Sequence, residues 1–145
     1  MRAFGTVLIV ALIAGLCLGA GAALALEWDQ DKVTEIAIRL QAEIKGLRAD
    51  PGISPAQDTA FQERRHAAAL ATLQTMQRDT GRLVSMLREG VGRDSTQSVF
   101  DGLEDELTQI RSLAEESWVR PSASEKIKQV RRAYAELEAF YRSPR

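Results

Sequence analysis

The sequence is poor in the residues that most often carry chemistry. Its 145 residues include one cysteine, Cys17, and one histidine, His66. A single cysteine excludes an intramolecular disulfide and any zinc site built from several cysteines. A single histidine excludes the paired histidine motifs of di-metal bundles. No Ser/His/Asp arrangement, Gly-rich phosphate loop or c-type haem attachment motif is visible. We therefore expect a protein that is not an enzyme and has no metal or cofactor.

The chain also lacks an excess of charge of either sign. It has 19 Lys and Arg against 20 Asp and Glu, for a net charge of −1. A nucleic-acid binder needs a basic excess to neutralise phosphates, so we expect no nucleic-acid partner. Hydrophobic residues make up 45% of the chain, enough for the core of one domain.

The N-terminal segment resembles an export signal. Residues 4–26 carry no charge, and the most apolar part is followed by small residues that include Ala23-Leu24-Ala25. This pattern predicts a signal peptide over residues 1–25, cut at the site formed by Ala23 and Ala25, and a periplasmic or secreted protein. The alternative is an uncleaved anchor, because the uncharged segment is long enough to span ~30 Å of hydrocarbon. The bundle would then be membrane-anchored outside the cytoplasm.

Three breaks divide the rest of the chain, at residues 50–55, 90–94 and 120–122. Between them apolar residues recur three and four positions apart, which places one apolar stripe on a helix face. We expect an all-α fold over residues 26–145, an antiparallel up-down-up-down four-helix bundle. The predicted helices cover residues 29–49, 55–89, 95–118 and 122–142.

Helix caps and charge refine this arrangement. Capping boxes begin at Ser54 and Ser122, and Asp29 and Asp94 are the other candidate caps. Residues 93–120 hold seven acids and three bases, whereas residues 121–145 hold six bases and three acids, so the third and fourth helices should be neighbours. Core positions should include Leu107 and Leu137, at the centres of their stripes.

Two clusters are expected to be structural. The acidic residues around position 104 should form a solvated helix face, because no Gly-turned loop is present to supply calcium ligands. The aromatic residues that the antiparallel topology brings to one end should plug the core. These clusters are Asp101, Glu104, Asp105 and Glu106 for the acids, and Trp28, Phe100, Phe140 and Tyr141 for the aromatics.

The last helix contains Arg131-Arg132-Ala133-Tyr134 and closes with Phe140-Tyr141-Arg142. It resembles the C-terminal end of the cytochrome b562 family, which are periplasmic four-helix haem proteins. That resemblance implies the bundle fold. The family takes a haem-ligating His from its last helix and a Met from its first, and neither residue occurs in those helices here. The resemblance therefore supports the architecture and argues against haem.

The second predicted helix is too long for its neighbours. Matched against the third helix across the turn at residues 90–94, it has a surplus at residues 55–66, or about 18 Å. These residues either protrude as a contact surface or are covered by the first helix and its loop. If they protrude, the candidate partner-binding residues are Phe61, Arg64, Arg65 and His66.

These features predict an exported, non-enzymatic helical bundle that acts through protein–protein contact in the cell envelope. The partner would be an envelope protein whose identity the sequence does not disclose, and self-association is left open. One alternative is a periplasmic small-ligand or haem carrier with cytochrome b562-like architecture. Another is a membrane-anchored bundle that retains its first 25 residues.

Overall fold

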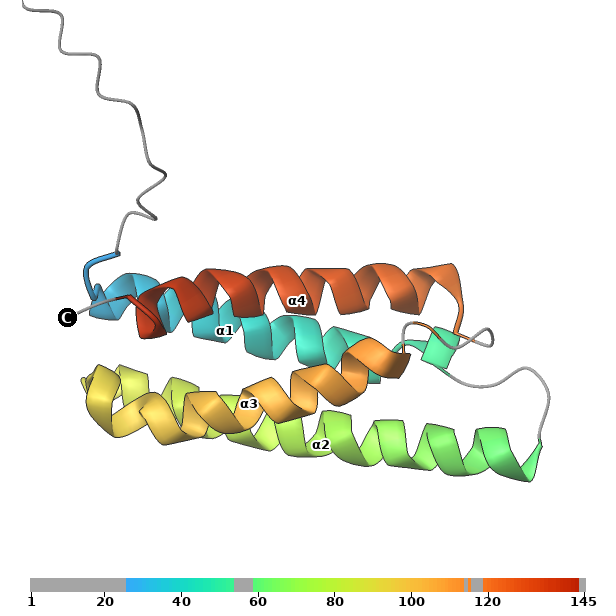
Figure 1. Ribbon diagram of the computed structural model, residues 1–145. Helices are drawn as coiled ribbons and strands as arrows, with labels where there is room; N and C mark the ends of the chain where they lie inside the picture. Colours follow the sequence, from blue (N-terminus) through green and yellow to red (C-terminus); the bar gives the residue numbers. More distant parts are fainter. Residues whose placement is uncertain (1–25, 54–58, 114, 116–118, 144–145) are drawn as a thin grey trace, which may run out of the picture.

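The protein is a four-helix bundle, seen here in a computed structural model that describes residues 26–53, 59–113, 115 and 119–143. The helices are α1 (Gln30–Arg48), α2 (Ala60–Arg88), α3 (Arg93–Leu113) and α4 (Pro121–Tyr141), with a short 3-10 helix, η1 (Pro51–Ile53), after α1. Successive helices run in opposite directions (Figure 1). The expected all-α, up-down-up-down bundle is confirmed. The predicted signal peptide, with Ala23 and Ala25, lies outside the described residues.

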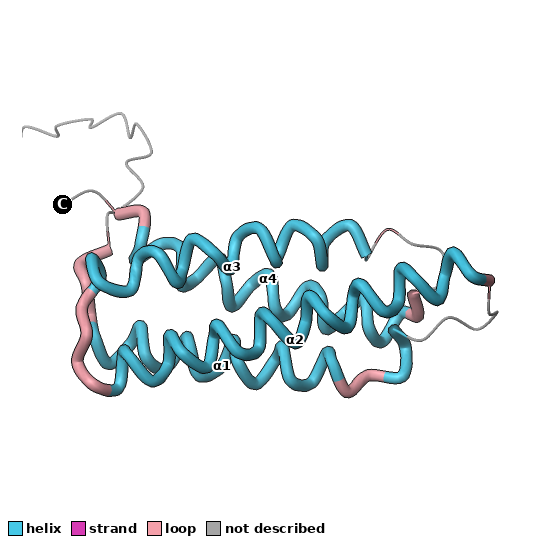
Figure 2. Tube along the Cα trace, turned by 90° about the horizontal axis from the view of Figure 1, so that it is seen from below, coloured by secondary structure: helices cyan, strands magenta, loops and turns pink. Residues whose placement is uncertain are grey.

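The four helices are not packed equally against one another. Helix α1 packs closely against α2 and α4, and α3 packs closely against α2, whereas the contact between α3 and α4 is the sparsest of the four neighbouring interfaces. Figure 2 shows the same arrangement from below. The third and fourth helices are neighbours, as their opposite charges predicted, and Arg142, directly after α4, pairs with Glu104 of α3 at 2.8 Å. Exposed pairs of this kind contribute little stability.

The helix starts follow some of the predicted caps and not others. Asp29 caps α1 as expected, and its carboxylate accepts a hydrogen bond from the Lys32 amide at 3.0 Å. Helix α2 begins at Ala60 and not at residue 55, because the Thr59 hydroxyl caps it. The predicted box at Ser54 lies outside the described residues. Helix α3 begins at Arg93, so Asp94 lies within its first turn instead of capping it.

The start of α4 corrects a second capping prediction. Its N-cap is Arg120, which makes no side-chain cap, and Pro121 occupies the first turn. The Ser122 hydroxyl instead donates to Asp50 Oδ1 at 3.2 Å. The turn after α2 agrees with expectation: Gly90 has a φ of +80°, and the Gly90 and Val91 amides donate to the Leu87 and Met86 carbonyls. This is a Schellman motif, which favours glycine because other residues are strained at that φ.

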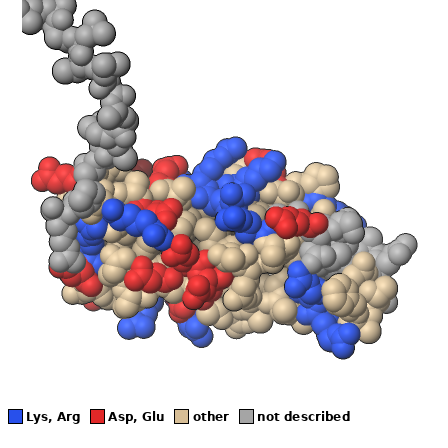
Figure 3. All heavy atoms as spheres, in the orientation of Figure 1, with Lys and Arg blue, Asp and Glu red and all other residues tan. Residues whose placement is uncertain are grey.

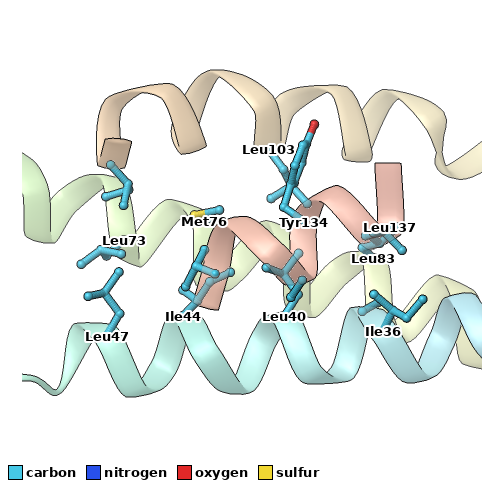
Figure 4. Close-up of a cluster of buried hydrophobic side chains, with 14 of the residues drawn as sticks. Ile36, Leu40, Ile44, Leu47, Leu73, Met76, Leu83, Leu103, Tyr134 and Leu137 are labelled. Carbon is cyan, nitrogen blue, oxygen red and sulfur yellow. The ribbon is translucent and has the colours of Figure 1, made fainter. Parts of the chain in front are cut away.

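The core contains the apolar stripes of all four helices (Figure 4). Leu137 is fully buried, as predicted. The prediction for Leu107 is wrong, since its side chain is only half-buried at the edge of the core. The inward position on that turn of α3 belongs to Glu106, which is 9% exposed, so the acidic run is not wholly a solvated face.

The end of the bundle where α1 begins and α4 ends is closed by aromatic rings, as predicted. Phe100 stacks on Tyr141 with 4.2 Å between ring centroids, and Trp28 meets Tyr141 edge-on at 5.2 Å. Phe140 is also buried, with Lys32 beside its ring. The buried Tyr141 hydroxyl is satisfied by the Thr96 hydroxyl at 2.7 Å. The rings therefore seal the core without leaving this polar group unpaired.

The different burial of two leucines gives a direct test of the helix register. Leu137→Ala should lower the free energy of unfolding by about 2–5 kcal/mol, because it leaves a cavity at a fully buried position. Leu107→Ala should cost about 1 kcal/mol or less, since its partner atoms lie on one side only. Urea unfolding followed by circular dichroism measures both. Equal losses for the two variants would contradict the register of α3.

Candidate functional site

The most exposed large apolar side chain among the described residues lies near the start of α2. Phe61 is 60% exposed, whereas the buried stripe of this helix starts only at Ala69. Figure 1 shows the N-terminal turns of α2 extending beyond the end of α3. We call residues 60–68 the α2 arm. The exposure of Phe61 is what the protruding interpretation of the surplus residues requires, and it disagrees with the covered one.

The four candidate residues on the α2 arm do not all face the solvent. Arg64 is exposed, and Arg65 and His66 are half-buried. Arg65 lines a small hollow of about 110 Å³, together with Thr72 of α2 and Gln109 of α3. The outward-facing pair is therefore Phe61 with Arg64, three residues apart on the helix. Arg65 and His66 lie nearer the junction between the arm and the bundle.

A buried carboxylate that no sequence pattern predicted joins the end of α1 to the start of α4. Asp50 is 8% exposed and forms an ion pair with Lys126 at 2.9 Å. It also accepts hydrogen bonds from the Gly52 amide at 2.7 Å and from Ser122. The hydrogen bonds from Lys126 and Gly52 lower the pKa of Asp50, so the group stays ionised.

Gly52 is needed beside this carboxylate for steric reasons. A Cβ atom at this position would lie 2.7 Å from both Asp50 Oδ1 and Ser122 Oγ. The Gly52 carbonyl also accepts a hydrogen bond from the Arg120 amide at 3.0 Å, which fixes the start of α4. The ion pair and hydrogen bonds of Asp50 are all made with residues that join α1 to α4. We therefore assign the cluster a structural role.

A second buried carboxyl, Glu106, lies between α3 and α2. Its Oε2 atom has no hydrogen-bond partner, and the carboxylate of Asp79 faces it from α2. Burial raises the pKa of Glu106 to about 7, and the neighbouring charge of Asp79 adds to this effect. Arg78 pairs with Asp79 at 3.0 Å and counters it only in part. Glu106 is therefore protonated in the folded protein below neutral pH.

The two buried carboxyls lie in different parts of the bundle. In the described part of the chain, no group of three or more His, Cys, Asp or Glu side chains is arranged to hold a metal ion. The same residues include no helix long and apolar enough to cross a membrane. Comparisons with protein-family models, curated proteins and solved structures found no match for this chain.

Glu106 makes stability depend on pH in a predictable direction. Its pKa is raised from 4.5 to about 7 on folding, so the folded state binds more protons between these values. The free energy of unfolding should fall by about 1–3 kcal/mol as pH rises through that window. Glu106→Gln should remove this fall and make the protein more stable than wild type at pH 8. Urea unfolding at pH 5, 6, 7 and 8 measures the effect.

Asp101→Asn is the matched control, because Asp101 is an exposed acid of the same helix that accepts a hydrogen bond from Gln97. This variant should show the same change of unfolding free energy with pH as the wild type. Asp50 does not interfere, since its lowered pKa confines its contribution to pH values below this window. A Glu106→Gln protein with an unchanged slope between pH 5 and 8 would show that Glu106 is ionised in the folded state.

Proposed function

We propose that the protein is an exported, non-enzymatic helical bundle that acts by contact with a partner protein of the cell envelope, and that the α2 arm makes this contact. The observation that carries the proposal is the 60% exposure of Phe61 on helical turns that extend past the core. An exposed aromatic side chain costs hydration free energy unless a partner covers it. Aromatic residues and arginine are also enriched at the energetic centres of interfaces.

The chemistry of the arm suggests what its partner presents. Phe61 offers an apolar ring, and Arg64 carries a positive charge one helical turn away. A complementary surface would be an apolar pocket flanked by an acidic side chain. Arg65 and His66 are half-buried and belong to the base of the arm, where they would set its position more than its affinity.

Export is proposed from the sequence of residues 1–25 and fits the start of the bundle. The uncharged segment ends in an A-x-A site immediately before Leu26. The Leu26 backbone nitrogen donates to the Ser143 hydroxyl at 2.9 Å, so the fold holds the chain from that residue onward. A membrane-anchored bundle with residues 1–25 retained is the alternative. The haem-carrier alternative lacks support from the residue types that the cytochrome b562 family uses as ligands.

The first test of this proposal is the mass of the native protein. Cleavage after Ala25 should give a polypeptide that starts at Leu26 and is found in the soluble envelope fraction. Intact-mass spectrometry of protein purified from native cells measures this, with N-terminal sequencing as a check. A full-length mass in the membrane fraction would replace secretion with anchoring.

The second test concerns the α2 arm. A photo-crosslinking amino acid at position 61 should give one dominant adduct in native envelope extract, identified by mass spectrometry. The same amino acid at Gln74, an exposed position of α2 above the core, is the control and should give none. Phe61→Ala should weaken binding of that partner by about 30-fold, the effect of losing an interface anchor worth ~2 kcal/mol.

The folding stability of Phe61→Ala distinguishes a role of this side chain in partner contact from a role in core packing. Because Phe61 is exposed, Phe61→Ala should change the free energy of unfolding by no more than about 0.5 kcal/mol. A loss of about 3 kcal/mol or more would mean that the ring is part of the core. A stable Phe61→Ala protein that binds its crosslinked partner with wild-type affinity would remove the α2 arm from consideration.

A further inference from the structure

A groove of about 290 Å³ runs between α3 and α4, where the bundle is packed most sparsely. Its walls combine apolar, hydroxyl and charged groups from both helices. The residues that line the groove include Glu104, Leu107, Arg111, Arg131, Tyr134 and Glu138. The groove lies on the side of the bundle shown in Figure 3, where basic side chains gather over α4 beside acidic side chains over α3.

The basic groups of this groove lack partners. Arg111 of α3 and Arg131 of α4 both line it and are exposed, and neither forms an ion pair within the described part of the chain. The acids of the groove are already engaged, because Arg142 pairs with Glu104 at 2.8 Å and with Glu138 at 2.5 Å. The two guanidinium groups therefore leave one end of the groove positively charged and open to an anion.

A buried hydroxyl in the groove also lacks a partner. Tyr134 is 4% exposed, and its hydroxyl oxygen is buried without a hydrogen bond. Figure 4 shows the ring projecting from α4 toward α3, with the hydroxyl at its far end. The carboxylates of Glu104 and Glu138 line the same groove, but both pair with Arg142, which lies beside the hydroxyl. A buried donor without an acceptor is unfavourable, and a ligand oxygen that accepts this hydrogen bond would relieve that cost.

The apolar part of the groove wall is formed by Leu107 and Ala135. Leu107, the half-buried leucine of α3, packs against the core and turns part of its side chain to this surface. From Glu104 to Arg111 the groove follows seven residues of α3, or about 10 Å. A ligand that spans this distance meets the arginines at one end and Tyr134 nearer the other, with an apolar body between them.

We propose that the α3–α4 groove binds a small organic carboxylate with a flat apolar body and a second oxygen. The carboxylate lies against Arg111 and Arg131, the body covers Leu107, and the distal oxygen accepts a hydrogen bond from Tyr134. The exposed Arg142 side chain shifts to admit that oxygen, which surface ion pairs permit because they are weak. The site is separate from the α2 arm and does not depend on the proposed partner contact.

Ligand-observed NMR with the full chain tests this assignment. The probe is 3-(4-hydroxyphenyl)propionate, which should bind saturably at a single site. Its carboxamide analogue keeps the shape but loses the charge, and it should bind at least about tenfold more weakly, since charge-assisted hydrogen bonds are the stronger ones. Inorganic phosphate should not displace the probe. Displacement by phosphate, or equal binding of the carboxamide, would overturn the proposal.

Variants then locate the site. Arg111→Gln with Arg131→Gln should weaken probe binding at least about tenfold. Arg82→Gln with Arg88→Gln removes two exposed arginines of α2 and should leave binding unchanged. Tyr134→Phe should weaken the hydroxylated probe several-fold but not 3-phenylpropionate, which lacks the distal oxygen; thermal melts confirm that each variant is folded. An unaffected Arg111/Arg131 variant, a control pair that loses binding, or no saturable binding to the wild type would overturn the proposal.

Discussion

All four helices share one apolar core, and each helix is positioned by where its buried stripe begins and ends. The stripe of α1 starts at Val33 and runs the length of the helix to Leu47. The stripe of α2 starts at Ala69, nine residues after the helix itself begins at Ala60. Because burial of apolar surface is the main stabilising term, the core holds the helix from Ala69 onward, and the turns before Ala69 bury no apolar side chain. The α2 arm is a consequence of this offset.

Much of the bundle could be predicted from periodicity, and the core of α4 around Leu137 follows it closely. The errors arise where one spacing fits two registers. On α3, both Glu106 and Leu107 lie at allowed distances from Leu103 and Ile110, and hydrophobicity favours Leu107. The structure places Glu106 inward, where burial favours its protonated form. A pattern of residue types does not report that protonation, so the prediction is wrong at this one position, while Phe100, Leu103 and Ile110 are buried as the pattern predicts.

Local sequence patterns also failed to predict some of the helix caps. Ser122 and Glu125 satisfy the spacing of a capping box, but the Ser122 hydroxyl is drawn to the buried Asp50 carboxylate, 72 positions away in the sequence. A charged acceptor gives the stronger hydrogen bond, so the long-range contact replaces the local one. The Asp50–Lys126 pair itself depends on η1 bringing Gly52 beside the carboxylate, which local sequence rules do not report. The length mismatch predicted an exposed segment that contains Phe61, and Phe61 is exposed in the structure. No sequence pattern predicted the groove between α3 and α4.

The groove between α3 and α4 is a consequence of how the four helices pack against one another. Helix α1 contacts both α2 and α4, and α2 contacts α3, so three close interfaces already connect all four helices. At the end of the bundle where α1 begins and α4 ends, the stacked rings of Phe100, Tyr134 and Tyr141 hold α3 against α4. Beyond this point the fourth interface can stay sparse without exposing the centre of the core, which is why Leu107 can lie at its edge. A bundle secured by three interfaces and an aromatic end can accommodate a ligand in the fourth without repacking its core.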